Sequence, residues 1–182
     1  MPPNPPRDPR EAPLSEQSEA GTDFAAMAAA TEEHAMMKPF EGTFAATVKM
    51  WMGPGEPAIS TGTMVNALDL GDRFLRQTYT GDQAEGPFPN FAGRGFWGYN
   101  KVDAVWEGVW IDNASTVLQI ERGSVEGNVW TMRGEMTNPS TGQPISKKSV
   151  ITLVDEDHHS MEMFFETPEG EMKGMEIQYV RR

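Results

Sequence analysis

Two side chains of this sequence have the chemistry of a general acid–base pair, Glu176 and His34. Glu176 lies in the last alternating apolar segment, where burial would raise the pKa of its carboxyl group toward a value suited to proton transfer. His34 lies in an alanine-rich segment beside two glutamates. A structural hydrogen bond or a solvent-facing position is the plainer interpretation of His34. The pair therefore defines an enzyme hypothesis that depends on whether the fold brings the two groups together.

The segment DEDHH at residues 155–159 gathers three carboxylates and two imidazoles. Adjacent histidines on a strand point to opposite faces, so they cannot both ligate one ion, and an Asp-rich stretch between strands is an ordinary hairpin turn. We expect no metal site here. No other histidine falls within the strand pattern, so haem is not expected, and the sequence predicts no cofactor.

The stretch GFWGYNKVDAVWEGVWID, residues 95–112, combines three tryptophans with several glycines. A tight turn in its middle sets Trp97 opposite Trp106 and Gly93 opposite Trp110, all on one face; a slip of one residue moves Trp97 to the other face. In either register an indole lies over a glycine, which clears room for it in a curved sheet. We predict that the three tryptophans line a ligand cavity. A solid aromatic core is the alternative.

The last hairpin predicts a second wall of that cavity. A turn at Glu169 and Gly170 divides the two strands into two faces. One face carries Glu162, Phe164, Glu166, Lys173, Met175, Ile177, Tyr179 and Arg181, and the other carries Met161, Met163, Phe165, Met172, Gly174, Glu176, Gln178 and Val180. We predict that the second face points inward. Glu176 and Gln178 would then be polar groups in an apolar ligand-binding wall, or would contact water at a barrel mouth.

The elements that position these residues follow a period-two pattern from Phe40 onward. Turn residues separate ten segments of strand character: 43–52, 58–69, 72–81, 90–99, 104–113, 115–124, 127–138, 145–155, 159–167 and 172–181. Such a meander exposes two edges unless it closes on itself. The pattern therefore predicts an all-β fold, a closed up-and-down antiparallel barrel of about ten strands.

Two different segments precede the strands. Residues 1–22 are proline-rich and polar, which predicts a disordered tail. The following alanine-rich stretch predicts one short helix over residues 24–37, with Asp23 as its cap and Pro39 beyond its end. We expect this helix to cap one end of the barrel, so that residues 23–182 form a single domain.

Composition limits the classes of partner. The chain has 182 residues, no cysteine and a formal net charge of −12. An acidic surface repels phosphate backbones, so nucleic acid is not an expected partner. No run is long and apolar enough for a membrane span, and no secretory signal opens the sequence, which favours a cytoplasmic location. The sequence leaves association into an oligomer open.

Several stretches resemble the bacterial domain of unknown function 1579 family, whose members resemble calycins, the superfamily of lipocalins and fatty-acid-binding proteins. They are EEHAMMKPFEGTF, LGDRFLRQTYTG, GPFPNFAGRGFWGYN, WIDNAST, ERGSVEGN and MEIQYVRR. The resemblance covers residues 33–182 and implies a barrel of about ten strands with an internal cavity. The calycin Gly-x-Trp motif is here Gly42-Thr43-Phe44, so a phenyl ring replaces the indole. The resemblance implies no particular activity for this chain.

Three hypotheses follow. The first is a non-catalytic binding module that holds a small, largely apolar molecule inside the barrel. The second is an enzyme that uses Glu176 and His34 on a small hydrophobic substrate. The third is a structural or oligomeric interaction protein with a solid core.

Overall fold

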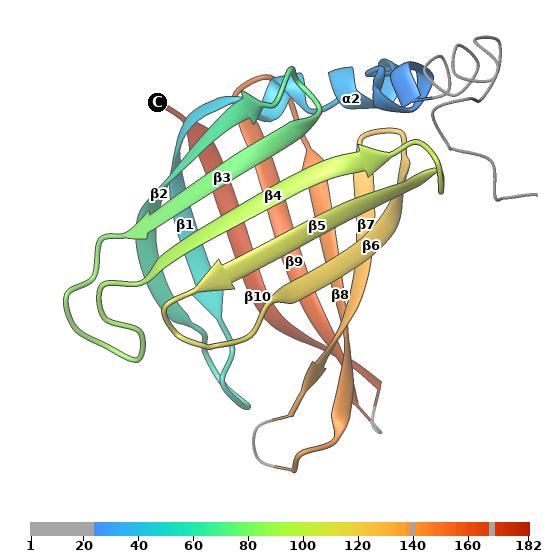
Figure 1. The fold of residues 1–182 in the computed structure, drawn as a ribbon. Helices are drawn as coiled ribbons and strands as arrows, with labels where there is room; N and C mark the ends of the chain where they lie inside the picture. The colour runs from blue at the N-terminus through green and yellow to red at the C-terminus, as the bar shows by residue number, and fades with distance from the viewer. Residues whose placement is uncertain (1–23, 139–140, 168–169) are drawn as a thin grey trace, which may run out of the picture.

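A computed structural model describes residues 24–138, 141–167 and 170–182, and it consists of a single antiparallel barrel (Figure 1). The predicted tail lies outside the described residues. The strands are β1 (Gly42–Met50), β2 (Ala58–Asp69), β3 (Phe74–Gly81), β4 (Ala92–Asn100), β5 (Val105–Asp112), β6 (Gln119–Glu126), β7 (Val129–Thr137), β8 (Pro144–Leu153), β9 (His158–Thr167) and β10 (Gly170–Arg181).

The barrel is closed because β1 pairs with β10 as well as with β2, and every other strand pairs with its neighbours in sequence. Closure gives each strand two partners and removes the exposed edges that an open meander would leave. The all-β fold class and the closed up-and-down topology predicted from the period-two pattern are thus confirmed.

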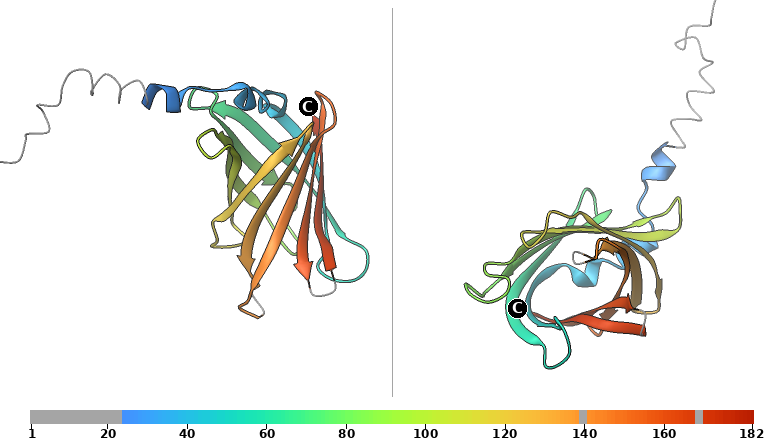
Figure 2. Two further views of the ribbon diagram at one scale, coloured as in Figure 1. Left: turned by 90° about the vertical axis from the view of Figure 1, so that its right-hand side faces the viewer. Right: turned by 90° about the horizontal axis from the view of Figure 1, so that it is seen from below.

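Short helical segments lie at one end of the barrel, which we call the helix end, and the first of them projects beyond the barrel wall (Figure 2). They are residues 24–28, α2 (Glu32–Ala35) and the 3-10 helix η2 (Lys38–Phe40). The single helix expected over 24–37 is interrupted because Thr31 adopts an extended conformation and begins α2 as its N-cap residue. The sequence Thr-Glu-Glu-His carries this new start, since a threonine before two acidic residues favours an N-cap.

Inward-facing side chains form two clusters of buried apolar residues. The cluster near the helix end contains Met37, Phe40, Leu75, Trp97, Trp106, Trp130 and Met132. The second cluster contains Phe44, Ala46, Val48, Met64, Tyr79, Ile177 and Tyr179. Phe40 comes from η2, so the helical segment contributes a plug to the core as well as a cover.

The strand bounds agree with the sequence pattern to within a few residues, except at the start of β6. The strand expected from residue 115 begins at Gln119. A local turn replaces its first residues, because Asp112 Oδ1 accepts a hydrogen bond from the Ala114 N–H at 3.0 Å. Side chains of this kind compete with strand pairing for backbone groups.

The β4–β5 hairpin has neither of the two registers expected from its turn. Trp97 lies opposite Gly108, Gly95 opposite Trp110, and Tyr99 opposite Trp106. The offset from the first expected register is even, so the three tryptophans still share the inward face. The expectation that indoles lie over glycines holds: a Cβ added at Gly95 would lie 2.8 Å from Trp110 Cε3.

The predicted faces of β10 are wrong beyond Gly174. The register with β9 shifts between Lys173 and Met175, and this bulge adds one residue to β10. One extra residue exchanges the inward and outward faces of everything after it. Ile177 and Tyr179 are therefore buried inside the barrel. Glu176, Gln178 and Val180, expected inside, lie on the outer face.

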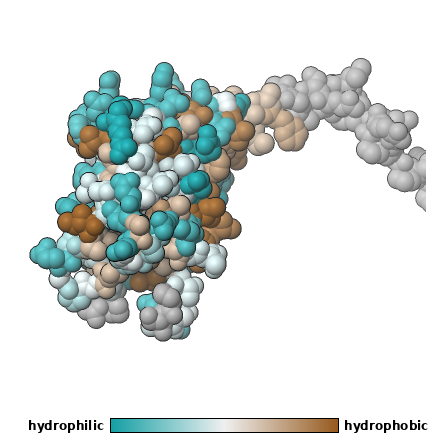
Figure 3. Space-filling view, turned by 90° about the vertical axis from the view of Figure 1, so that its left-hand side faces the viewer, coloured by the Kyte–Doolittle hydropathy of each residue, from teal (hydrophilic) through white to brown (hydrophobic). Residues whose placement is uncertain are grey.

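Among the described residues, no helix is long and apolar enough to cross a membrane. The side of the barrel seen in Figure 3 carries scattered hydrophobic side chains among hydrophilic ones.

Candidate functional site in the barrel interior

The half of the interior next to the helix end is filled with aromatic rings. Trp106 and Trp130 are each 1% exposed, and Phe40 packs edge-on against Trp97 and Trp130 with 5.3 Å between ring centroids in both pairs. The two predicted cavity residues Trp97 and Trp106 thus lie in a packed core. Among the described residues, their buried indole nitrogens have no hydrogen-bond partner.

The half of the interior toward the other end, the far end, carries polar side chains. We call them the polar strip, and each lies on the inward face of β5, β6 or β8. The strip consists of Asp112, Gln119, Glu121, Lys147 and Ser149. Two are buried, Lys147 at 5% and Ser149 at 3% exposure. Polar groups placed on one side of an otherwise apolar interior are typical of ligand pockets.

Hydrogen bonds join the polar strip into one chain. Asp112 Oδ2 accepts bonds from Trp110 Nε1 and from Gln119 Nε2, both at 3.1 Å. Lys147 Nζ donates to Gln119 Oε1 at 2.9 Å and lies 3.2 Å from Glu121 Oε1. The chain ends where Ser149 Oγ donates to Glu121 Oε1 at 2.7 Å.

The polar strip combines one cation with two carboxylates. Burying charged groups is costly unless each has partners. The ammonium of Lys147 has three N–H groups, and the contacts above occupy two of them. One donor of Lys147 and the second oxygen of Glu121 can therefore serve a further hydrogen-bonding group.

An apolar wall adjoins the polar strip along β9. Phe165 pairs with Lys147, Met163 with Ser149 and Met161 with Ile151, so these side chains share the inward face. Met161, Met163, Phe165 and Trp110 are only partly buried. Partial exposure of inward-facing side chains means that solvent reaches the far half of the interior, in contrast to the packed helix end.

Glu176 and Gln178 do not reach this interior. Glu176 contacts Lys49 at 3.1 Å and Lys173 at 3.4 Å on the outer face. The hydrogen bond from Lys49 lowers the pKa of Glu176, which is the opposite of the shift expected for a carboxyl group in an apolar wall. Gln178 is exposed.

His34 makes a structural contact within the helical segments at the helix end. Its Nδ1 accepts a hydrogen bond from the Thr31 N–H at 3.0 Å, and its ring packs edge-on against Tyr99. Burial lowers the pKa of His34. The structure therefore leaves His34 at the helix end and Glu176 on the outer wall, and the acid–base pair of the enzyme hypothesis does not converge.

The two adjacent histidines point to opposite faces, as expected. His158 is exposed and contacts Asp155 Oδ1 at 2.8 Å. His159 is 5% exposed inside the barrel, where burial, with a smaller effect of the Arg181 charge, lowers its pKa to about 4. In the part of the chain that the structure describes, no group of three acidic, histidine or cysteine side chains could hold a metal ion.

Lys147 and Glu121 were not anticipated as site residues. The alternation of β8 places Lys147, Ser149 and Ile151 on one face, and the alternation of β6 does the same for Gln119 and Glu121. That signal is present in the sequence. It is weak because charged residues on strands usually face solvent. Only the arrangement of β6 and β8 on either side of Gly134 in β7 shows that Glu121 and Lys147 face the interior.

Comparisons with known proteins support the family resemblance and the fold. Residues 29–181 match the sequence profile of a family described as "Protein of unknown function (DUF1579)". No curated protein matches the chain. The crystal structure of Rv2717c from M. tuberculosis superposes with a TM-score of 0.59 at 16% identity, covering 85% of this chain and 99% of that one. At this identity the likeness shows the fold alone.

A redesigned β-barrel matches with a TM-score of 0.42 at 15% identity, covering 82% of this chain and 95% of that one. A score at this level carries no argument about function.

Proposed function

The chain belongs to the DUF1579 family, whose description assigns no activity, and from the geometry of the barrel we propose that it binds a small, largely apolar molecule in the far half of its interior. The observation that carries the proposal is the polar strip beside the Met and Phe wall of β9. The calycin-like mode of binding and a location in the cytoplasm belong to this proposal.

The two walls suit different parts of one ligand. Met161, Met163 and Phe165 present a polarizable, adaptable apolar surface, and methionine adjusts to ligands of irregular shape. Lys147 and Glu121 lie beside this surface and offer one donor and one acceptor. A ligand with an apolar body and one neutral hydrogen-bonding group would satisfy both.

Binding is favoured over catalysis because the charged groups of the polar strip are already paired. Glu121 accepts a hydrogen bond from Ser149 and contacts Lys147, so both charged groups already have partners within the protein. The packing of aromatic rings supports the solid-core hypothesis only for the half of the interior near the helix end.

Native mass spectrometry of the protein purified from its own cell lysate tests the proposal. We expect an additional mass that is lost under denaturing conditions. A second measurement follows the methionine methyl signals by NMR during titration with 1-decanol. The methyl groups of Met161 and Met163 should shift, while that of Met52, which is 68% exposed, should not.

A matched pair of variants tests the location of the site. Met163→Gln places an amide on the proposed wall, and Met52→Gln makes the same change at an exposed position. Loss of the bound mass and of the decanol shifts in the first variant only would support the site. An unliganded mass together with unshifted Met161 and Met163 signals would overturn the proposal.

A further inference from the structure

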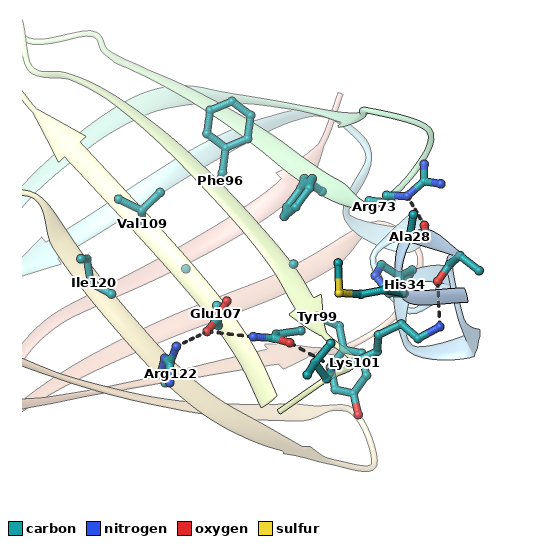
Figure 4. A pocket seen from close by; sticks show the side chains of 17 residues that line it. Ala28, His34, Arg73, Phe96, Tyr99, Lys101, Glu107, Val109, Ile120 and Arg122 are labelled. Atoms are coloured by element: carbon teal, nitrogen blue, oxygen red, sulfur yellow. Dashed lines mark hydrogen bonds and ion pairs between the residues drawn. The ribbon is translucent and has the colours of Figure 1, made fainter. Parts of the chain in front are cut away.

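A second hollow lies outside the barrel, on the wall formed by β4, β5 and β6, and we call it the outer groove (Figure 4). Its volume is about 610 Å³, which falls within the range of about 300–1,000 Å³ typical of small-molecule pockets. It is separate from the interior site, because its floor consists of side chains on the opposite face of the same strands.

The floor of the outer groove is a row of apolar side chains. Phe96 pairs with Val109, and Val109 pairs with Ile120, so the three lie side by side across three strands. Figure 4 shows them on successive strands, pointing the same way. Phe74 extends the row beside Gly98, where an added Cβ would lie 2.8 Å from the phenyl ring. Ile120 is 60% exposed.

The helical cover builds one wall of the outer groove. Residues 27–29 line it, and two cations hold their backbone in place. Lys101 Nζ donates to the Ala26 carbonyl at 2.7 Å, and Arg73 Nε donates to the Ala28 carbonyl at 2.5 Å. This wall makes the groove a hollow instead of a flat patch, which favours a slim occupant over a large surface.

The charge around the outer groove is opposite to that of the whole chain. Three cationic residues line it, Arg73, Lys101 and Arg122, against one acidic residue, Glu107. The chain as a whole has a formal net charge of −12. Arg122 contacts Glu107 at 2.6 Å through Nη2, and its side chain is 62% exposed. A guanidinium carries five N–H groups, so Arg122 retains donors for a second anion.

We propose that the outer groove binds an amphipathic carboxylate, a small molecule with an alkyl or aryl body and one carboxylate group. The apolar body covers Phe96, Val109 and Ile120. The carboxylate lies among the cations at the rim, where Arg122 and Lys101 attract it. The exposed apolar surface suits the body of this ligand, and the neighbouring cations suit its carboxylate. A neutral alkane would contact only the first part of the site, and a hydrophilic anion only the second.

The test is a titration of the full chain with dodecanoate, kept below its micelle-forming concentration, and followed by the methyl NMR signals of Val109 and Ile120. Dodecanol, with the same chain and no charge, is the comparison ligand. We expect saturable shifts of both methyl groups, with tighter binding of dodecanoate than of dodecanol.

Two variants and one control locate the binding. Ile120→Glu should weaken dodecanoate binding by about ten- to a hundredfold, the factor that corresponds to losing the burial of one large aliphatic side chain. Arg122→Gln should weaken dodecanoate and leave dodecanol unchanged. Ile59→Glu makes the first change at a residue of β2 that is 66% exposed and outside the groove, and should have no effect.

Four results would overturn the proposal. One is the absence of shifts at Val109 and Ile120 at every concentration. A second is dodecanoate shifts confined to Met161 and Met163, which would support the interior site instead. A third is equal affinity for dodecanoate and dodecanol. The fourth is ligand-free self-association in analytical ultracentrifugation that Ile120→Glu abolishes, which would assign the groove to a second copy of the chain.

Discussion

His159 places an imidazole ring inside the barrel, between the two apolar clusters. The ring stacks on Tyr179 with 4.4 Å between centroids and meets Phe44 edge-on at 4.6 Å. Burial, together with the Arg181 charge, lowers its pKa to about 4 from the ordinary histidine value of 6.5. The folded protein thus holds His159 neutral where the unfolded chain would protonate it.

This shift predicts a loss of stability at low pH. Because the folded pKa is depressed, the unfolded state binds a proton first as the pH falls, so stability declines between about pH 6.5 and pH 4. The full effect is about 3 kcal/mol. His159→Phe should remove this part of the pH dependence, as measured by urea unfolding at a series of pH values.

His158→Phe is the control for this experiment, because His158 is exposed. Its unfolding free energy should keep the decline that His159 causes, because the buried imidazole ring is still present in this variant. A His159→Phe variant with an unchanged pH profile would contradict the assignment.

A second prediction concerns the buried ion pair of the polar strip. Lys147→Met removes the cation beside Glu121, whose side chain is 18% exposed, and should destabilise the barrel by about 3–5 kcal/mol. The double change Lys147→Met with Glu121→Leu should recover much of this loss, because no unpaired charge is then buried. Urea unfolding of the two variants measures the difference. A double variant as unstable as the single one would show that the pair is not the cause.

At the scale of elements, glycines decide where the large rings of β4 and β5 can lie. Trp110 packs over Gly93 and Gly95, and Trp97 lies opposite Gly108. A glycine that faces an indole leaves the volume of one side chain to the ring. In this position the indole N–H of Trp110 donates a hydrogen bond to Asp112 of the polar strip.

Gly95→Ala should therefore be destabilising. Its new Cβ would lie 2.8 Å from Trp110 Cε3 and 2.9 Å from the Val109 carbonyl oxygen, and neither atom can move freely. We expect a loss of about 1–3 kcal/mol in the free energy of unfolding. Thermal unfolding followed by far-UV circular dichroism would measure this.

Gly53→Ala is the matched control, since no heavy atom lies within 4 Å of the added Cβ in the β1–β2 turn. Its effect should be close to zero. Equal losses in both variants would mean that chain flexibility, and not the contact with Trp110, sets the cost.

At the scale of the whole molecule, closure joins the first strand to the last. Phe44 pairs with Arg181, and the Arg182 N–H donates to the Thr43 carbonyl at 2.9 Å. Each strand keeps two partners wherever the chain is cut in a loop. The order of the strands around the barrel is therefore independent of where the chain begins.

A circular permutant tests this property. Residue 182 would be joined to residue 24 by about 12 Gly/Ser residues, which span about 20 Å on average. The new ends would lie between Glu85 and Gly86, in an exposed loop. We expect the permutant to keep the circular dichroism and the dispersed amide NMR spectrum of the parent. An aggregated or unfolded permutant would show that the native chain order is required.

The sequence by itself determined the number of strands, most of their bounds and the closed barrel. These features depend on local signals, namely the alternation of apolar residues and the turn residues between strands. It left two registers open for the hairpin of Trp97, Trp106 and Trp110, and the observed register keeps the faces of the first because the two differ by an even number of residues. The opposite faces of His158 and His159 follow from the same alternation.

Only the tertiary structure decided which polar side chains make up the interior site. The bulge at Gly174 turned Glu176 and Gln178 outward, and nothing in the local pattern of β10 marks where one residue is added. Lys147 became an interior residue because Glu121 and Gln119, 26 and 28 residues away, meet it over Gly134 of the intervening strand β7. A charge can be buried only where the fold supplies its partners, and such partners belong to strands that the sequence places far apart.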